Sequence, residues 1–424
     1  MDQAHDRVVD VLVVGAGLAG LTAAATAARS GRHVAVLDVR SAGGRARSET
    51  RSGFVFNQGP HALYRRGPGS AVLASFGIRP TGSPPAQRVF GSRSGTLGLL
   101  PTSAGSLARS PLLGRRAKAQ LATLLARFPR LEASTLAPLS AASWVGSLGV
   151  REEAASVLRT LLRVATYAPD LELISADAAV GQLQLAHSGG VVYLDGGWGR
   201  LVDSLAGAAR AAGAVILDRE RALGLTAGPG GALEVSTDAG GWLASAVVVA
   251  VGGPQATRAF LSAPDDWGVG ADATAACLDL ALRRPPHRRV AFALEEPLYL
   301  STHSPAADLA PPGAALVHVM RYGARSSKQD RSQLWEFARL VGISEDDVVV
   351  ERFLHRMIVS HALPAPGLGL AGRPAVTASG QAGVFLAGDW IGPSGLLADA
   401  SLASGAAAGT AAAAPELAAA ARPL

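Results

Sequence analysis

A glycine-rich turn between a short apolar strand and a helix is the feature that most constrains the fold of this chain. Residues 8–14, VVDVLVV, have the β-branched and apolar character of a buried parallel strand. Gly15, Gly17 and Gly20 follow as G-x-G-x-x-G. The Ala-rich segment 18–30 then has the composition of a helix. Such glycines allow a tight turn, close approach of backbone to a pyrophosphate, and close packing of helix on strand. The pattern predicts a Rossmann-like α/β unit that holds a dinucleotide at the start of this helix.

Asp38 and the residues after it extend this prediction. Asp38 ends the next predicted strand, HVAVLDV, where a carboxylate accepts hydrogen bonds from ribose hydroxyl groups. Gly43 and Gly44 let the backbone turn close to a cofactor, and Arg45 can reach a phosphate. The alternative for these three residues is a plain glycine turn beside a solvent-facing arginine.

Composition narrows the class of protein. Of 424 residues, 49% are apolar and 17% are charged, which suits a folded α/β protein rather than a disordered one. The net charge is +6, but the basic residues are scattered and few aromatic residues lie among them, so we predict no nucleic-acid binding. Cys277 is the only cysteine, so we expect it in the core, with no intrachain disulfide and no metal site. The charged N-terminus leads directly into the first strand, so we expect no signal peptide and a cytoplasmic protein.

The rest of the chain alternates between helical and extended patterns. Residues 66–190 have helical patterns broken by proline and glycine, and the chain ends with a strand, a glycine turn and an Ala-rich helix at 384–414. The helix predicted at 112–128 is apolar on one face and basic on the other. We favour a solvated basic face on a core-packed helix, with contact to a membrane surface as the lesser alternative. The other predicted elements are two helices within 143–167, strands at 191–194 and 214–225, a hairpin leading into 246–253, strands within 275–300 and at 315–322, and a helix at 326–342.

This order indicates that the chain leaves one nucleotide-binding domain and later returns to it. The predicted nucleotide-binding domain comprises residues 1–65, 190–260 and 370–424. The predicted substrate-binding domain, of α+β type, comprises residues 66–189 and 261–369.

Further motifs give the chain a resemblance to a known family. The chain resembles the flavin-dependent amine oxidase and phytoene desaturase superfamily in the order of its motifs: a strand, G-x-G-x-x-G, an acid and then GGRA. The other matching segments span nearly the whole chain: NQGPH (57–61), LDGGWGRLVDSLAGAARAAGAVI (194–216), AVVVAVGG (246–253) and VFLAGDWIGPSGLLADASLASGAAAG (384–409).

The resemblance implies a Rossmann-like FAD-binding domain, discontinuous in sequence, whose C-terminal strand and helix close on the flavin. Asp389 would hold the ribityl chain or a hydroxyl near the pyrophosphate, and backbone amides near Leu396 and Leu397 would face the pyrimidine edge. The backbone near Ala222 would meet the adenine, and residues 59–60 would lie close to the isoalloxazine ring. The predicted cofactor-binding residues are Gly15, Gly17, Leu18, Ala19, Gly20, Asp38, Val39, Arg40, Gly43, Gly44, Arg45, Gly59, Pro60, Ala222, Gly252, Gly388, Asp389, Leu396 and Leu397.

Departures from the family pattern bear on the chemistry. A second G-x-G-x-x-G, which would bind NAD(P)H, is missing from the sequence, so we expect oxygen, a quinone or no external electron acceptor. Amine oxidases of the superfamily place a lysine near flavin N5, whereas Lys118 and Lys328 both lie in polar contexts. The C-terminal motif has no cysteine for covalent attachment, so we expect non-covalent FAD.

The sequence offers several candidates for side chains that line the flavin or the substrate. His61 follows a Gly-Pro pair and could reach a substrate or the flavin, or could instead pack the turn as a hydrogen-bonded histidine. His187 and Trp390 are weaker candidates for lining the flavin. For Tyr64 and Tyr299 we favour a place in the core over one in a pocket.

The sequence therefore predicts an FAD-dependent oxidoreductase. The favoured reaction is desaturation of a largely apolar substrate, such as a polyene or terpenoid, by hydride transfer to flavin N5. The alternatives are oxidation of an amine or another small molecule, and isomerisation or cyclisation with no net redox change. A lipid-binding protein is a third alternative, because the Rab GDP-dissociation inhibitors resemble this fold. Retention of Asp38, the GGR run and the Gly-Asp segment argues against it.

Overall fold

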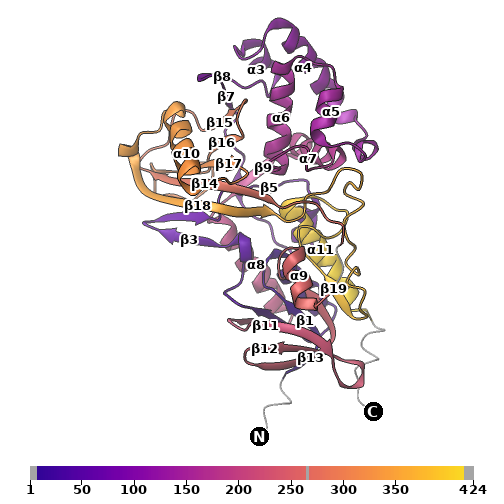
Figure 1. Ribbon diagram of the computed structural model, residues 1–424. Helices are drawn as coiled ribbons and strands as arrows, with labels where there is room; N and C mark the ends of the chain where they lie inside the picture. Colours follow the sequence, from indigo (N-terminus) through magenta and orange to yellow (C-terminus); the bar gives the residue numbers. More distant parts are fainter. Residues whose placement is uncertain (1–6, 264–266, 415–424) are drawn as a thin grey trace.

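The computed structural model of the protein describes residues 7–263 and 267–414 (Figure 1). The sheet that begins with β1 lies at the bottom of this view, a second large sheet crosses the middle, and helices α3 to α7 lie at the top. Parts of two predictions, for the N-terminal residues 1–6 and the C-terminal residues 415–424, lie outside the described residues.

The first large sheet carries the glycine turn. Within the described residues its strand order is β10, β2, β1, β13, β12, β11, and β19 also pairs with β13. The pairs β10–β2, β2–β1, β1–β13 and β13–β19 are parallel, whereas β11 and β12 form an antiparallel extension. The strand bounds are Val8–Val14 (β1), Val34–Asp38 (β2), Val215–Asp218 (β10), Ala222–Ala227 (β11), Leu233–Thr237 (β12), Gly240–Val249 (β13) and Val384–Leu386 (β19).

Helices α1 (Leu18–Arg29), α8 (Gly197–Ala211) and α11 (Leu397–Ala412) share one hydrophobic core with this sheet. Small residues let α11 approach α1 closely. A Cβ at Gly405 would lie 2.3 Å from the carbonyl oxygen of Ala19, and one at Gly409 would lie 2.4 Å from that of Ala23. The C-terminal helix is thereby held against the helix that follows the glycine turn.

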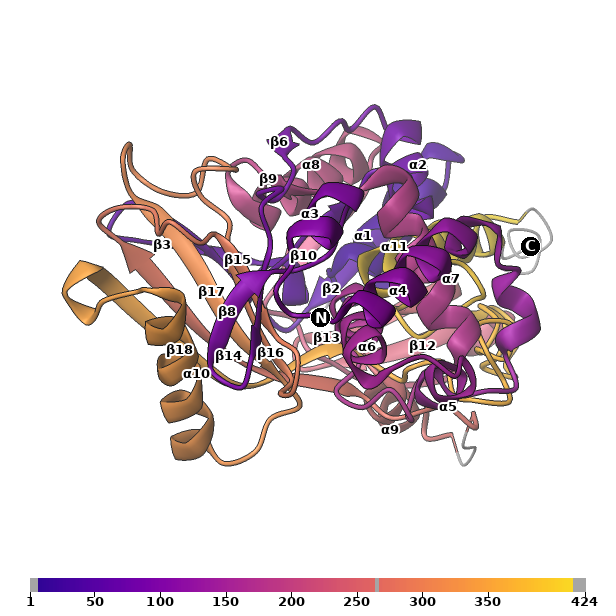
Figure 2. The same ribbon diagram turned by 90° about the horizontal axis from the view of Figure 1, so that it is seen from above.

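The second large sheet forms one wall of the cavity described below. Its order within the described residues is β18, β14, β17, β16, β15, β7, β8. Helix α10 (Ser327–Val341) packs on one face, and α4 and α6 pack on the other (Figure 2). The strand bounds are Phe90–Arg93 (β7), Thr96–Leu99 (β8), Ala273–Leu282 (β14), Val290–Ala293 (β15), Leu298–Thr302 (β16), Ala315–Tyr322 (β17) and Val348–Ser360 (β18).

The predicted helices of the middle region are confirmed. The segment 112–128 contains α4, whose Ala117 and Leu121 are buried while Arg115 and Arg116 are exposed. Residues 143–167 contain the end of α5 and the whole of α6, as expected for two helices. The remaining helices and short strands are α2 (Pro68–Ser75), α3 (Ala104–Arg109), α4 (Arg115–Arg127), α5 (Ala141–Ser147), α6 (Glu152–Thr166), α7 (Ala176–Gly189), α9 (Pro254–Leu261), β3 (Ser48–Arg51), β4 (Phe54–Asn57), β5 (Leu63–Tyr64), β6 (Gly82–Ser83) and β9 (Val191–Leu194).

The predicted fold class is confirmed: a Rossmann-like α/β sheet is combined with a second sheet and its helices. The helical pattern expected for residues 66–190 is wrong at β6, which pairs with β9, and at β7 and β8, which extend the second sheet. Among the helices of the described ranges, none has both the length and the apolar character that a membrane span requires. The domain boundaries given above stay a prediction.

Candidate functional site

A cavity of about 1310 Å³ runs from the glycine turn to the second sheet. Its walls come from both large sheets and from helices α1, α6, α7 and α11. Pockets for single small ligands are typically about 300–1,000 Å³ in volume, so this cavity has room for a dinucleotide and a second molecule.

The glycines of the turn have separate steric roles. Gly15 has φ +107, and a Cβ there would lie 2.4 Å from the carbonyl oxygen of Ala250. A Cβ at Gly20 would lie 1.8 Å from the carbonyl oxygen of Gly15, so α1 could not pack on β1. Apart from Gly17 itself and its two chain neighbours, no described residue has an atom within 4 Å of a Cβ built at Gly17, which lines the cavity. Gly17 therefore leaves open the space in front of the first turn of α1, where backbone N–H groups favour an anion.

Asp38 is fixed at the end of β2 by backbone donors. Its Oδ2 accepts from Ala16 N at 2.7 Å, and its Oδ1 accepts from Arg40 N at 2.9 Å. Asp38 and Arg40 both line the cavity. A carboxylate held in this way keeps further lone pairs for hydroxyl donors.

The GGR run is attached to the glycine turn. Gly43 N donates to Ala16 O at 2.7 Å, and a Cβ at Gly44 would lie 3.5 Å from the Cα of Gly17. Gly43 and Gly44 have φ of +122 and +54, so both need the left-handed region that favours glycine. Arg45 follows them at the cavity wall.

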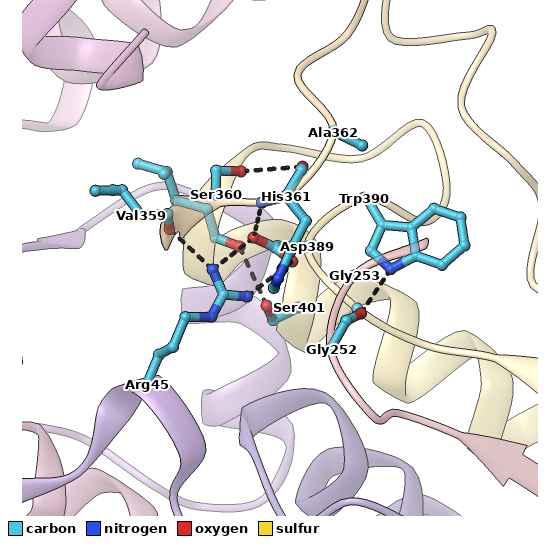
Figure 3. A network of polar contacts seen from close by, with 12 residues as sticks. Arg45, Gly252, Gly253, Val359, Ser360, His361, Ala362, Asp389, Trp390 and Ser401 are labelled. Carbon is cyan, nitrogen blue, oxygen red and sulfur yellow. Dashed lines mark hydrogen bonds and ion pairs between the residues drawn. The ribbon is translucent and has the colours of Figure 1, made fainter. Parts of the chain in front are cut away.

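Arg45 connects the N-terminal and C-terminal motifs (Figure 3). Its Nη1 donates to Asp389 Oδ2 at 2.9 Å and to Val359 O at 2.9 Å, and its Nη2 lies 2.8 Å from Asp389 Oδ1. His361 N also donates to Asp389 Oδ2, at 2.9 Å, and the His361 ring approaches Oδ1. Burial alone would raise the pKa of Asp389, but Arg45 and His361 hold it well below its usual value. Asp389 is therefore an ionised, oriented carboxylate beside the cavity.

The first turn of α11 reaches the cavity through Leu397, whose φ is +57. Leu396, the N-cap residue, points into a hydrophobic core and does not line the cavity. Neither leucine can cap the helix with a side-chain oxygen, so its first backbone N–H groups stay free for a ligand. Asp399 lies two residues further along and is 2% exposed, and burial raises its pKa to about 6.

Most predicted cofactor residues do line the cavity. Gly20, Gly59 and Leu396 do not, but each is adjacent in sequence to a residue that does. The predicted residues in the lining are Gly15, Gly17, Leu18, Ala19, Asp38, Val39, Arg40, Gly43, Gly44, Arg45, Pro60, Ala222, Gly252, Gly388, Asp389 and Leu397.

Among the three catalytic candidates, only His61 lies at the cavity. Trp390 is 1% exposed, packs against Trp267, and donates from Nε1 to Gly252 O at 2.8 Å (Figure 3). His187 is exposed near the end of α7 and is outside the lining. The geometry therefore argues against contact of Trp390 or His187 with a flavin.

Sequence reasoning missed an aromatic chamber at one end of the cavity. All five tyrosines of the sequence gather there. Tyr64, Tyr167, Tyr193 and Tyr299 line the cavity, and Tyr322 stacks on Tyr299 with ring centroids 6.5 Å apart. Tyr64 and Tyr299 are buried, as expected, but they also face the cavity, so favouring core over pocket was wrong. The tyrosines come from five separate elements or loops, and no local pattern indicates that they meet.

A buried polar cluster around Asp279 was also missed. The segment AACLDLAL contains an acid within an apolar strand, and this was the one available signal. Cys277, Asp279 and His318 have donor atoms within 4.8 Å of one another, a spacing that a metal ion could use. However, the guanidinium of Arg352 already binds the same carboxylate, and burial raises the pKa of the Cys277 thiol well above its usual value. The group is therefore best described as a hydrogen-bonded cluster.

Comparison with known proteins agrees with this geometry. Residues 10–267 match the FAD dependent oxidoreductase family. The chain belongs to this family. No curated protein matches the chain.

Solved structures of an oxidoreductase and of two oxidases share the fold. An oxidoreductase from Methanosarcina mazei is 17% identical, with a TM-score of 0.76, over 94% of this chain and 99% of that chain. Cyclohexylamine oxidase from Brevibacterium oxydans IH-35A is 15% identical, with a TM-score of 0.72, over 96% and 98% of the two chains. Wild-type putrescine oxidase bound to putrescine is 16% identical, with a TM-score of 0.73, over 95% and 98%. The resemblance to the amine oxidase superfamily is thus confirmed at the level of the fold.

The residues present fit FAD. An open space at Gly17, the free N–H groups of α1 and the fixed carboxylate of Asp38 suit a ribose and a pyrophosphate. Ala222 lines the wall beside Asp38, on β11. The first turn of α11, at Leu397, lines the same cavity.

Proposed function

We propose that this FAD-dependent oxidoreductase desaturates a largely apolar organic substrate, with FAD held non-covalently and oxygen or a quinone as the electron acceptor. When bound, FAD supplies the hydride acceptor for oxidation at carbon. The observation that carries the proposal is the apolar, aromatic chamber at the end of the cavity away from the glycine turn.

The residues that line the cavity support most of the contacts to FAD that the sequence predicts. The first turn of α1 and the Arg45 guanidinium would bind the pyrophosphate, and Asp38 would accept from a ribose hydroxyl. Asp389 would accept from the ribityl chain. The first turn of α11 would place positive partial charge at the pyrimidine edge, where it favours electron density on the flavin. Cys277 is buried on β14 outside the lining, which supports non-covalent binding.

The chamber suits an apolar substrate. Its walls lie between α6 and the second sheet and include Tyr167, Phe292, Tyr299, Met320 and Met357. The charged residues of the lining lie mainly near the glycine turn and along β18 instead. A buried apolar wall excludes water, which strengthens electrostatic interactions and protects a reactive intermediate.

Amine oxidation is the competing function, because two of the solved structures of the same fold are named as amine oxidases. Among the described residues that line the cavity there is no lysine. Lys328 is exposed on α10, and Lys118 donates to Ala108 O on the surface side of α4. The side chain that amine oxidases of the superfamily place near N5 therefore has no counterpart in this lining.

Anaerobic bleaching of the flavin absorbance discriminates between these functions. The FAD-loaded protein is mixed with separate panels of polyenes, terpenoids and amines. We expect bleaching by a polyene or terpenoid and none by the amines. Bleaching by amines alone would remove the desaturation proposal. Turnover that requires reduced flavin but consumes no acceptor would select isomerisation or cyclisation.

A further inference from the structure

A second pocket, of about 370 Å³, lies between helix α6 and the ends of strands β7 and β15. The described residues that line it do not line the larger cavity, so this pocket is separate from the site proposed for FAD and substrate. Three of them are arginines, which indicates a site for an anion. The charged and polar residues of its lining are Arg93, Glu152, Ser156, Arg159, Arg163 and Glu295.

Helix α6 and strand β7 bring the arginines together. Four residues of the lining lie on α6: Glu152, Ser156, Arg159 and Arg163. Their spacing of four, three and four positions corresponds to one stripe along an α-helix. On the other side of the pocket, Arg93 ends β7, and its Nη2 donates to Ser156 Oγ at 2.5 Å. Guanidinium groups from two elements that are far apart in sequence therefore face one pocket.

The two carboxylates of the pocket already have partners. Glu152 is mostly exposed and forms an ion pair with Arg159. Glu295 accepts from the backbone N and the Oγ of Ser94, at 2.8 and 3.1 Å. Across the described ranges, neither carboxylate forms a hydrogen bond or an ion pair with Arg93 or Arg163.

Arg163 has no counterpart in the protein. Within residues 7–263 and 267–414, its guanidinium forms no hydrogen bond and no ion pair, and its Nε is buried. The Nε of Arg93 is buried without a partner in the same ranges. Burial lowers the pKa of the Arg163 guanidinium below its usual value. Because buried cations are normally paired, these two guanidinium groups are available to a ligand.

The charges of the pocket lining do not balance. Three arginines and two glutamates leave one positive charge. Outside the lining, the groups that act on Arg163 include the carboxylate of Asp170 and the guanidinium of Arg321, which have opposite signs. Asp170 is exposed to water, which screens its charge, and it forms no ion pair with Arg163 in the part of the chain that the structure describes. The pocket therefore has a positive potential that favours an anion.

We propose that this pocket binds a small oxyanion, a carboxylate or a phosphate group, between the guanidinium groups of Arg93 and Arg163. Guanidinium groups donate paired N–H bonds to both kinds of oxyanion. A volume of about 370 Å³ is at the small end of the range for ligand pockets, so the ligand would be a small organic acid or a phosphate ester. It would bridge α6 and β7. The inference does not depend on the reaction proposed above.

The first test is calorimetric titration of the protein with sodium phosphate, with the ionic strength held constant by sodium chloride. FAD is present in excess, so that phosphate does not occupy the N-terminal end of α1. We expect one saturable site in the wild type, and binding weaker by at least about tenfold in Arg163→Gln. Arg116 is exposed on α4 outside the pocket, so Arg116→Gln is the matched control for the loss of one charge and should bind like the wild type.

Sodium acetate, titrated in the same way, distinguishes the two oxyanions. Tighter binding of phosphate would indicate a phosphate ester as the ligand, and tighter binding of acetate would indicate an organic acid. The inference would be overturned if neither anion shows saturable binding to the wild type. Equal affinity in the wild type and Arg163→Gln would also overturn it.

A second variant covers failure of Arg163→Gln to fold. Ser156→Asp adds a carboxylate beside Arg93, inside the pocket. This carboxylate would take the place of the ligand, so the variant should lose oxyanion binding without a fall in melting temperature. Oxyanion binding at the wild-type affinity in Ser156→Asp would contradict the inference.

Discussion

The Asp399→Asn variant should become more stable relative to the wild type as pH rises, because the substitution removes a poorly solvated carboxylate. Asp399 lies in the first turn of α11, and its Oδ1 accepts from Gly69 N at 3.0 Å. Its Oδ2 is buried without a hydrogen-bond partner among the described residues. A Cβ built at Gly67 would lie 2.0 Å from Oδ2, so the carboxyl fills a close-packed site that an isosteric Asn also fits.

The sign and size of the effect follow from the pKa of Asp399, which burial raises from 3.8 to about 6. The folded state then binds the proton more tightly than the unfolded state, so the wild type loses stability as pH rises from about 4 to about 6. At a pH above both pKa values, a shift of about two units lowers the free energy of unfolding of the wild type by ~3 kcal/mol. The N-terminal end of α11 favours the ionised form, by typically 0.3–1 and at most ~2 kcal/mol, so the burial penalty prevails.

The assay is urea unfolding of wild type and variant at about pH 4.5 and about pH 7.5. The unpaired amide of Asn costs about 1 kcal/mol at either pH. The informative quantity is therefore how far the difference in free energy of unfolding between variant and wild type changes from the lower to the higher pH. We expect the variant to gain about 2 kcal/mol relative to wild type between these pH values.

Asp177→Asn is the matched control for Asp399→Asn. Asp177 is buried in the first turn of α7, and its two oxygens accept from Ala178 N and Leu370 N. The variant should lose about 1 kcal/mol at about pH 7.5, because the amide nitrogen of Asn replaces one of two oxygens that accept from the backbone. If the difference in free energy of unfolding between Asp399→Asn and the wild type does not change with pH, the reasoning is refuted.

Four further predictions follow from the structure. Gly20→Ala should lower the melting temperature strongly, because its Cβ would lie 1.8 Å from the carbonyl oxygen of Gly15. Gly17→Ala should keep the melting temperature of the FAD-free protein but weaken FAD binding at least tenfold in a fluorescence titration, because its Cβ enters open space. Asp389→Asn should weaken FAD binding at least tenfold, since charge-assisted hydrogen bonds contribute ~1.5–3 kcal/mol; affinity equal to wild type would exclude the proposed contact. The Cys277 thiol, buried and with a raised pKa, should react with a thiol reagent only after unfolding, and rapid reaction of the folded protein would contradict its placement.

The nucleotide-binding part of the fold could be predicted from sequence because its signals are local. The strand at 8–14, the glycine turn, the helix after it and Asp38 lie within one short βαβ segment and constrain one another. The segment at 384–409 was recognisable from its similarity to a family, since its contact with Arg45 spans most of the chain. Local periodicity alone could not have shown that contact.

The missed elements depend on partners far away in sequence. The strand β18 carries Glu351, Arg352, His355 and Arg356, and such a polar strand gives a weak pattern. The guanidinium of Arg352 is buried because acceptors from distant segments, Asp279 and Glu49 among them, bind it. Trp390 is a weaker candidate from the sequence for lining the flavin, but its side chain lies outside the cavity lining and donates to the backbone at Gly252. Adjacent positions in a motif can therefore face opposite sides.

The two ends of the chain should together hold one FAD molecule without a covalent bond. The most direct test is the absorbance spectrum of the purified protein, recorded before and after acid precipitation. We predict the two absorption bands of an oxidised flavin, with all of the colour released into the supernatant and identified as FAD. Colour that stays with the precipitate would contradict non-covalent binding. A colourless protein that does not take up added FAD would contradict the assignment of the cavity.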